Sequence, residues 1–276
     1  MSRWSCPTTR GNRLGGLVFG LIALALSPAV QGGEETKEYQ AQAFTSAPPG
    51  PRPIVGERWG FHGRWLGIPI GSGWVEVKEL IELEGRAAYH IEVQGHSNEL
   101  LSTFYPIHDV IHSYLDAETL QPLRFEKDQR EGHYRAQEVV VFDHAKGLAT
   151  YHSLVNQSIK EIPFPPDVQD LISALFWFRT QSLRPNQTLR LQLYTDEKIY
   201  QTDIEVKAPL LLELLKRGTF PCLVVEPKAS FKGLLVKRGR LWAYFTADER
   251  RLPLLIRVTT PWGPMSAVID EASLQR

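Results

Sequence analysis

Two histidines in this 276-residue chain have a spacing that metal proteins use. His108 and His112 lie four positions apart with Asp109 and Asp116 nearby, and on a helix this spacing would place both imidazoles on one face, as zinc sites require. The residues around them are β-branched and aromatic, which favours a strand. On a strand the two imidazoles would stand about 13 Å apart, too far for one ion to join them. We therefore predict no metal site.

Nucleophile and acid–base patterns are equally weak. Ser72 lies in a Gly-Ser-Gly turn and not in the Gly-x-Ser-x-Gly elbow of many serine hydrolases. Asp248 and Glu249 lie in a polar segment expected to be a hairpin loop, where solvent does not raise a carboxyl pKa as general acid catalysis requires. Cys6 lies in the N-terminal leader, so Cys222 is left without a disulfide partner and is expected to be a small buried hydrophobic residue. We assign no catalytic residue, cofactor or disulfide, and enzymatic activity stays undecided.

The residues that we expect at a ligand site are Trp177, Arg179 and Trp242. Two interpretations stay open for them. In the first, the tryptophans fill the core and Arg179 stabilises the negative end of a helix dipole. In the second, Trp177 and Trp242 line an apolar cavity between a helix and a sheet, in which Arg179 reaches Asp170 or the anionic head group of a ligand.

The element that would position Trp177 and Arg179 is a single apolar helix, expected over residues 167–183. Asp167 is predicted as its N-cap with Asp170 at the third helical position, and Pro185 closes the segment. Apolar residues cover nearly the whole circumference of this helix. A helix of this kind must be buried and not laid on a surface.

Most of the remaining chain alternates polar and apolar residues between turn signals, which is typical of antiparallel strands. A sheet of about a dozen strands cannot stay flat, so it curls. The sequence therefore predicts a mainly β fold, namely a curled, barrel-like antiparallel sheet in a single domain, with the helix plugging or covering its interior. The segment Pro209 to Gly218 fits either a short helix or a strand.

The N-terminal part of the chain has the layout of an export signal. Basic residues precede the apolar run Leu14 to Ala25, so residues 1–33 are predicted as a signal peptide, 34–54 as a Pro-rich linker and 55–276 as the folded domain. We expect a periplasmic protein of a Gram-negative bacterium, and an uncleaved signal anchor is the alternative. After signal removal the body is expected to be soluble or at most peripheral to a membrane. Lys+Arg and Asp+Glu are balanced at 31 each, which argues against nucleic-acid binding.

Several motifs in the body occur together in one known family. They are "GERW" at Gly56, "GIPIGSGWVEV", "PDVQDLISALFWFR" from Pro166 to Arg179, and "GRLWAYFTADERRLPLLI" from Gly239 to Ile256. In their order and spacing the chain resembles the exported bacterial envelope proteins catalogued as domain of unknown function 3108. The resemblance implies a curled, barrel-like antiparallel sheet, similar in outline to periplasmic lipoprotein carriers. The family has no agreed activity, so it supplies no catalytic residues.

Three functions are weighed against each other. The first is a non-enzymatic periplasmic module that binds or carries an apolar ligand or an envelope component, and a cavity of several hundred Å3 under the helix would favour it. The second is a scaffold or assembly factor of the cell envelope that acts through its outer surface, which an exposed apolar patch would favour. The third is a hydrolase whose site is dispersed along the chain. We adopt the first hypothesis, with the scaffold as the alternative.

Overall fold

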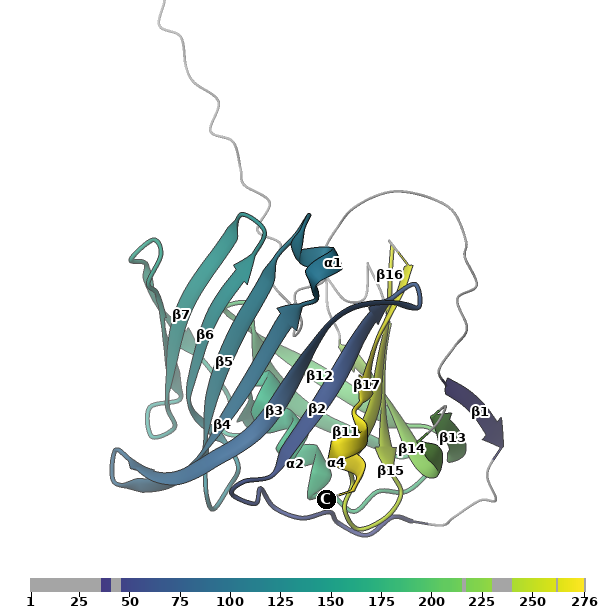
Figure 1. Cartoon of the computed structure of the whole chain (residues 1–276). Helices are drawn as coiled ribbons and strands as arrows, with labels where there is room; N and C mark the ends of the chain where they lie inside the picture. The colour runs from purple at the N-terminus through teal and green to yellow at the C-terminus, as the bar shows by residue number, and fades with distance from the viewer. Residues whose placement is uncertain (1–35, 41–45, 215–216, 230–239, 262, 276) are drawn as a thin grey trace, which may run out of the picture.

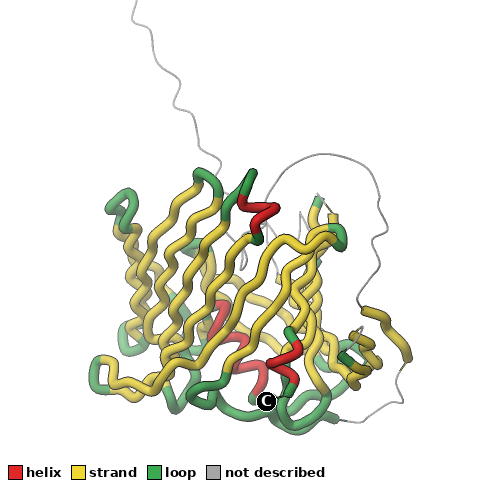
Figure 2. The backbone as a smooth tube through the Cα atoms, viewed as in Figure 1, coloured by secondary structure: helices red, strands yellow, loops and turns green. Residues whose placement is uncertain are grey.

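The computed structural model describes residues 36–40, 46–214, 217–229, 240–261 and 263–275. Strands make up most of these residues and helices are few, as Figures 1 and 2 show, so the predicted mainly β fold is confirmed. The predicted signal peptide at 1–33 lies outside the described residues. Within the described ranges, no helix combines the length and apolarity that crossing a membrane requires.

The elements follow in chain order. The first strands are β1 (Thr36–Gln40), β2 (Arg58–Trp65), β3 (Ile68–Leu83), β4 (Arg86–Ser97), β5 (Ile107–Asp116), β6 (Pro122–Glu131), β7 (Tyr134–Asp143), β8 (Leu148–Ser153) and β9 (Ile159–Pro163). The later strands are β10 (Val168–Gln169), β11 (Thr188–Thr195), β12 (Lys198–Val206), β13 (Leu210–Leu214), β14 (Gly218–Ala229), β15 (Leu241–Thr246), β16 (Pro253–Thr260) and β17 (Gly263–Ile269). The helices are α1 (Glu99–Ser102), α2 (Leu171–Arg179) and α4 (Glu271–Leu274).

All the strands belong to one 17-stranded sheet, in which β17 pairs with β2 and so joins the C-terminal strands to the N-terminal ones. From β2 the order runs outward to β9, and from β17 it runs back through β14 to β10 and β1. Among the described strands these two ends do not pair, so the sheet curls without closing (Figure 1). The pairing is antiparallel throughout except between β10 and β11, which run parallel.

Alternation along each strand decides which side chains face the interior of the curl. On β5, Ile111, Ser113 and Leu115 are buried, while His108 is exposed and His112 is half-buried. Successive side chains of a strand point to opposite faces, so the first three lie on the inner face and the histidines on the outer face. This two-residue period is the signal from which the sequence predicted strands.

Helix α2 is shorter than expected and begins later. Its N-cap is Asp170, whose carboxylate accepts hydrogen bonds from the backbone N–H groups of Ile172 and Ser173 at 2.7 Å. The prediction of Asp167 as the cap is wrong, because the chain after Asp167 first forms the two residues of β10 beside β11. The Asp170 cap is completed by Ser173, whose hydroxyl accepts a bond from the backbone N–H of Asp170.

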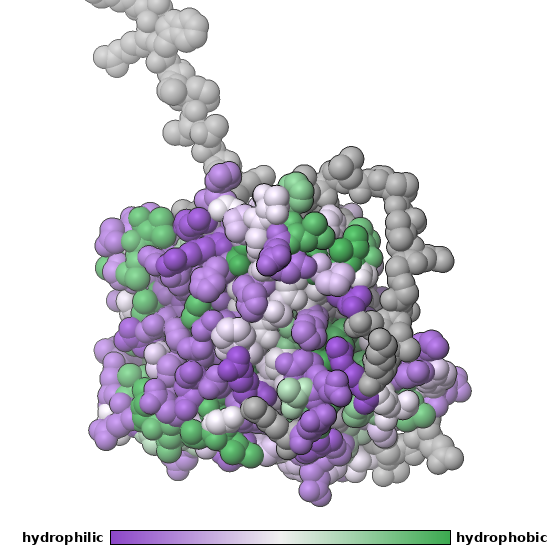
Figure 3. All heavy atoms as spheres, viewed as in Figure 1, coloured by the Kyte–Doolittle hydropathy of each residue, from purple (hydrophilic) through white to green (hydrophobic). Residues whose placement is uncertain are grey.

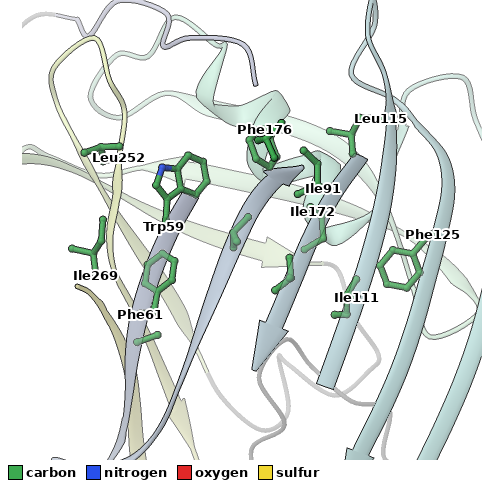
Figure 4. Packing of buried hydrophobic residues seen from close by; sticks show 14 of the residues in the cluster. Trp59, Phe61, Ile91, Ile111, Leu115, Phe125, Ile172, Phe176, Leu252 and Ile269 are labelled. Carbon is green, nitrogen blue, oxygen red and sulfur yellow. The ribbon is translucent and has the colours of Figure 1, made fainter. Parts of the chain in front are cut away.

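The buried face of α2 fills one end of the curled sheet. Phe176 is fully buried and stacks on Trp59 of β2, with ring centroids 5.4 Å apart. Figure 4 shows Phe176 and Ile172 facing Ile91 and Leu115 from neighbouring strands. The hydrophobic core therefore lies between α2 and the inner face, as expected for a helix that plugs the sheet.

The described part of the segment expected to be a linker is structured. Thr36–Gln40 forms β1 and pairs with β13. Farther along, Ala47 and Leu183 exchange backbone hydrogen bonds, and the N–H of Gly50 donates to the Arg179 carbonyl at 2.8 Å. A side chain at position 50 would clash with Arg251, since a Cβ there would lie 2.7 Å from the Arg251 Cβ. The segment is thus a strap across the end of the sheet that α2 fills.

We predict that Phe176→Ala lowers the free energy of unfolding by about 3–5 kcal/mol, because it leaves a cavity beneath Trp59. Phe104→Ala is the matched control, since Phe104 is 72% exposed and its truncation should cost less than about 0.5 kcal/mol. Urea unfolding measures both. Equal, small losses for the two variants would show that α2 does not carry the core.

Candidate functional site on the inner face

A pocket lies beyond the N-terminal end of α2, on the inner face of β4 to β7. Its opposite wall is the end of β11 and the turn that leads into β12. The pocket is open to solvent at its mouth, and its cavity has a volume of about 50 Å3. It lies beside the helix and not under it, because the packing of Phe176 and Ile172 fills the space directly beneath α2.

One part of the pocket wall is apolar. It consists of Val93, Ile111, Phe125, Val140 and Leu171. Four of these residues come from four adjacent strands, and Leu171 is the first residue of α2. The strand residues also belong to the main hydrophobic core, so this part of the wall is continuous with the packed end of the sheet.

The other part of the wall on the same strands is polar. Asp109, Lys127, Gln129 and Glu138 line it, and the Lys127 ammonium lies 3.0 Å from the Glu138 carboxylate. These residues occupy inward positions of β5, β6 and β7, farther from α2 than the apolar residues. The pocket therefore has an apolar end near the helix and a polar, ionisable end toward the opposite rim.

Behind Asp109 and Gln129 lies the buried carboxyl group of Glu131. Burial and, after it, the nearby charge of Asp109 together raise its pKa from an ordinary 4.5 to about 7. The Gln129 amide donates a hydrogen bond to Glu131, which favours the ionised form. Asp109 itself accepts a hydrogen bond of 2.9 Å from the backbone N–H of Arg130. Glu131 therefore exchanges its proton near neutral pH.

The wall formed by β11 brings a tyrosine and two further acids. Tyr194 packs edge-to-face against Phe142 of β7, with centroids 5.3 Å apart. Asp196 lies at the mouth of the pocket and is exposed to solvent. The protein atoms around its carboxyl group remove part of its hydration, which raises its pKa. Glu197 forms an ion pair with Lys160 of β9. This ion pair joins the two ends of the sheet by side chains where no strand pairing joins them in the described chain.

Two buried oxygen atoms in this pocket have no hydrogen-bond partner in the described structure. They are the amide oxygen of Gln129, on a side chain that is 4% exposed, and the hydroxyl of Tyr194, on a side chain that is 5% exposed. A buried polar atom without a partner costs roughly 1–3 kcal/mol, so such atoms are uncommon in folded proteins. Both residues line the pocket, so each of these oxygens is an acceptor in its wall.

Arg179, one of the predicted ligand residues, is engaged within the fold. Its guanidinium is fully buried and donates to both carboxylate oxygens of Glu57, at 3.0 and 2.8 Å. It also lies 4.4 Å from the centroid of the Trp59 ring. Arg179 thus meets Glu57 and not Asp170, whose carboxylate is bonded by Ser113 and by the start of α2. The neighbouring buried Arg251 has its pKa lowered to about 10 by burial and by the charge of Arg179.

Trp177 and Trp242 lie in different hydrophobic clusters. Trp177 is half-buried and packs with Phe178 against β11, β12 and β14, whereas Trp242 packs against the main core and lies under the Arg240 guanidinium. Neither residue lines the pocket described above. The geometry does not bring Trp177, Arg179 and Trp242 together at one site. A ligand-binding role for these residues stays a prediction.

The histidines that raised the metal hypothesis lie on the outer face. His112 lies 2.9 Å from His90, ring nitrogen to ring nitrogen, and His96 lies 2.9 Å from the Ser72 hydroxyl. Within the described ranges, no group of three or more His, Cys, Asp and Glu residues is placed to hold a metal ion. Cys222 is fully buried, and burial raises the pKa of its thiol to about 12, so it behaves as a hydrophobic residue.

The open end of the sheet carries exposed apolar residues. Leu100 and Phe104, in and just after α1, are 62% and 72% exposed. Helix α1 joins the ends of β4 and β5, so these side chains lie close in the chain to Gly95 and Asp109 of the pocket. Figure 3 shows hydrophobic surface at the same end, over the region where α1 lies in Figure 1.

Sequence comparison identifies the family. A family model described as "Protein of unknown function (DUF3108)" matches residues 59–270. The chain belongs to this family. The DUF3108 match confirms the resemblance noted from the motifs, whereas no curated protein matches the chain.

A solved structure supports the DUF3108 fold independently. It is the crystal structure of a β-barrel-like protein of the domain of unknown function DUF1849 from Brucella abortus. The two structures align with a TM-score of 0.54 over 80% of this chain and 98% of the other, at 8% sequence identity. At that identity the likeness concerns the fold alone, and it agrees with the open, barrel-like sheet.

The Arg179–Glu57 pair generates a stability prediction. Glu57→Gln should lower the free energy of unfolding by about 3 kcal/mol, because it leaves a buried guanidinium without its counter-charge. The control is Glu76→Gln, which breaks the pair of Arg58 and Glu76 at 3.4 Å on the surface and should cost less than about 1 kcal/mol. Chemical denaturation compares the two, and a Glu57→Gln loss no larger than that of the control would contradict a buried pair.

Glu131 generates a pH prediction. Its pKa is higher in the folded state than in the unfolded chain, so between these two values the folded state holds more protons. The contribution of Glu131 to stability is therefore full below about pH 4.5 and is lost as the pH rises through about 7. Relative to Glu131→Gln, the wild type should lose stability between pH 5 and pH 8. Glu126→Gln, on the outer face of the same strand, should leave this pH dependence unchanged, and unfolding at a series of pH values tests both variants.

Proposed function

We propose that this DUF3108 protein is a non-enzymatic binding module of the cell envelope, exported by its N-terminal leader to the periplasm. Its ligand is an amphiphile held in the pocket between the inner face of β4 to β7 and the end of β11. This proposal keeps the carrier hypothesis drawn from the sequence and moves the site from Trp177 and Trp242 to the pocket.

The observation that carries the proposal is the division of one pocket into two chemical halves. Val93, Phe125 and Leu171 offer apolar contact at the end near α2, and Asp109 and Gln129 offer polar contact at the other. Ligand sites in proteins combine an apolar lining with a few polar groups that fix orientation. A ligand with an apolar chain and a polar head matches both halves, whereas a wholly apolar ligand would leave the polar groups unpaired.

One observation favours the scaffold alternative. Leu100 and Phe104 expose apolar surface at the open end, which suits contact with an envelope partner. The same residues also suit delivery of an amphiphile from a membrane surface into the pocket beside them. The two functions differ in whether the purified protein contains a small molecule.

The test is extraction and mass spectrometry of protein expressed with its own leader and purified from the periplasm of a Gram-negative host. We expect an amphiphilic compound in the wild type and its strong depletion in Thr195→Trp, because Thr195 lines the pocket and a larger side chain there fills it. Thr188→Trp, at the exposed far end of the same strand, is the control and should retain the compound. Empty wild-type protein in repeated preparations, or equal loading of both variants, would end the carrier proposal.

A further inference from the structure

Resting on the proposed function, we infer that the ligand's head group is an organic ammonium, held by Asp109 and Gln129 in the polar half of the pocket. The inference concerns the class of head group and not the apolar chain. It depends on the balance of hydrogen-bond donors and acceptors in the polar half of the pocket.

The polar half offers many more acceptors than donors. Carboxylates of Asp109, Glu138, Asp196 and Glu197 line the pocket, and Lys127 is the cation in the lining. The Lys127 ammonium is already paired with Glu138, and Glu197 is paired with Lys160 outside the lining. The lining therefore keeps a negative balance, which favours a cation and opposes a phosphate or carboxylate head.

The Gln129 amide oxygen, which has no partner in the described structure, gives an independent reason. The Gln129 amide group donates to Glu131, which fixes the amide so that its oxygen is left as an acceptor without a donor. Gln129 pairs with Asp109 across β5 and β6, and an ammonium group has up to three N–H donors and no acceptor, so it can donate to the Gln129 amide oxygen and the Asp109 carboxylate together. A hydroxyl head group has one donor and could satisfy one of them.

Glu131, which lies behind the pocket wall, should change its protonation when such a cation binds. Glu131 faces Asp109 on β5, Gln129 and Lys127 on its own strand, and Tyr105 and Tyr134 from neighbouring segments. A cation held beside Asp109 favours the ionised form of Glu131, because it offsets the negative charge that holds the proton there. Binding near neutral pH should therefore release a proton from Glu131, whereas an uncharged head group should not.

The experiment uses three probes with the same apolar chain, dodecylammonium, dodecanol and dodecanoate, each below its micelle concentration. Isothermal titration calorimetry of the full chain, freed of bound compounds, measures each affinity at pH 7 in two buffers of different ionisation enthalpy. We expect dodecylammonium to bind most tightly and to show buffer-dependent heat from proton release. Asp109→Asn should weaken dodecylammonium by about tenfold or more, the effect of losing a charged hydrogen bond, and leave dodecanol unchanged.

Matched variants separate the outcomes. Glu126→Gln on the outer face of β6 should bind as the wild type does, and Glu131→Gln should bind without proton release. If Asp109→Asn does not fold, Gln129→Met tests the same contact from the neighbouring strand. Equal or tighter binding of dodecanol or dodecanoate would overturn the ammonium inference and leave the pocket as a site. Binding of no probe, or binding that Thr195→Trp does not reduce, would mean that water alone occupies the pocket and would overturn the proposed function as well.

Discussion

The contact between Phe176 and Trp59 determines which end of the curled sheet is filled by packed side chains and which end contains the pocket. The inner face of a curled sheet is apolar over much of its area, and water must be kept from it. Helix α2 covers that face with one stacked aromatic pair and the aliphatic residues around it. Because α2 begins at Leu171, it does not cover the inner face of the strands beyond that point, and these strands form the pocket.

Buried charges attach the rest of the chain to this core. The Asp170 carboxylate caps α2 and accepts a bond from Ser113 of β5, so the start of the helix is fixed to the sheet. At the other end of α2, the Arg179 guanidinium donates to Glu57, just before β2, and the Arg179 carbonyl accepts from Gly50 of the strap. Asp170, Ser113 and Arg179 are buried, and their bonds within the protein replace the bonds to water that they have lost. The helix is thereby located at both ends by polar contacts and along its length by packing.

Much of the fold could be predicted because its signals are local. The two-residue alternation of β5 and the apolar circumference of α2 are visible in short windows of sequence. The position of the N-cap was missed because Asp167 and Asp170 are equally good capping residues. What distinguishes them is the pairing of Val168 and Gln169 with β11, which lies about twenty residues farther along the chain.

The candidate site was missed for a related reason. Asp109, Gln129 and Tyr194 are far apart in sequence, and only the strand register brings them to one pocket. One local signal was present: Lys127, Gln129 and Glu131 occupy the inward positions of β6, where the alternation calls for apolar residues. Polar residues in an otherwise apolar inward row mark a place where the interior is not packed. The sequence indicated Trp177, Arg179 and Trp242 instead, because large aromatic residues and a cation on an apolar helix are easily recognised.

The open seam of the sheet has a mechanical consequence. In a closed barrel the number and stagger of the strands fix the girth, and widening it would break a continuous ladder of hydrogen bonds. Here the two ends meet through Lys160 and Glu197, an ion pair of the partly exposed kind that costs no more than about 1 kcal/mol to separate. The packing of Tyr194 on Phe142 adds to this clasp. The girth of the molecule is therefore set by contacts between side chains, and a change in it would break no strand pairing in the described sheet.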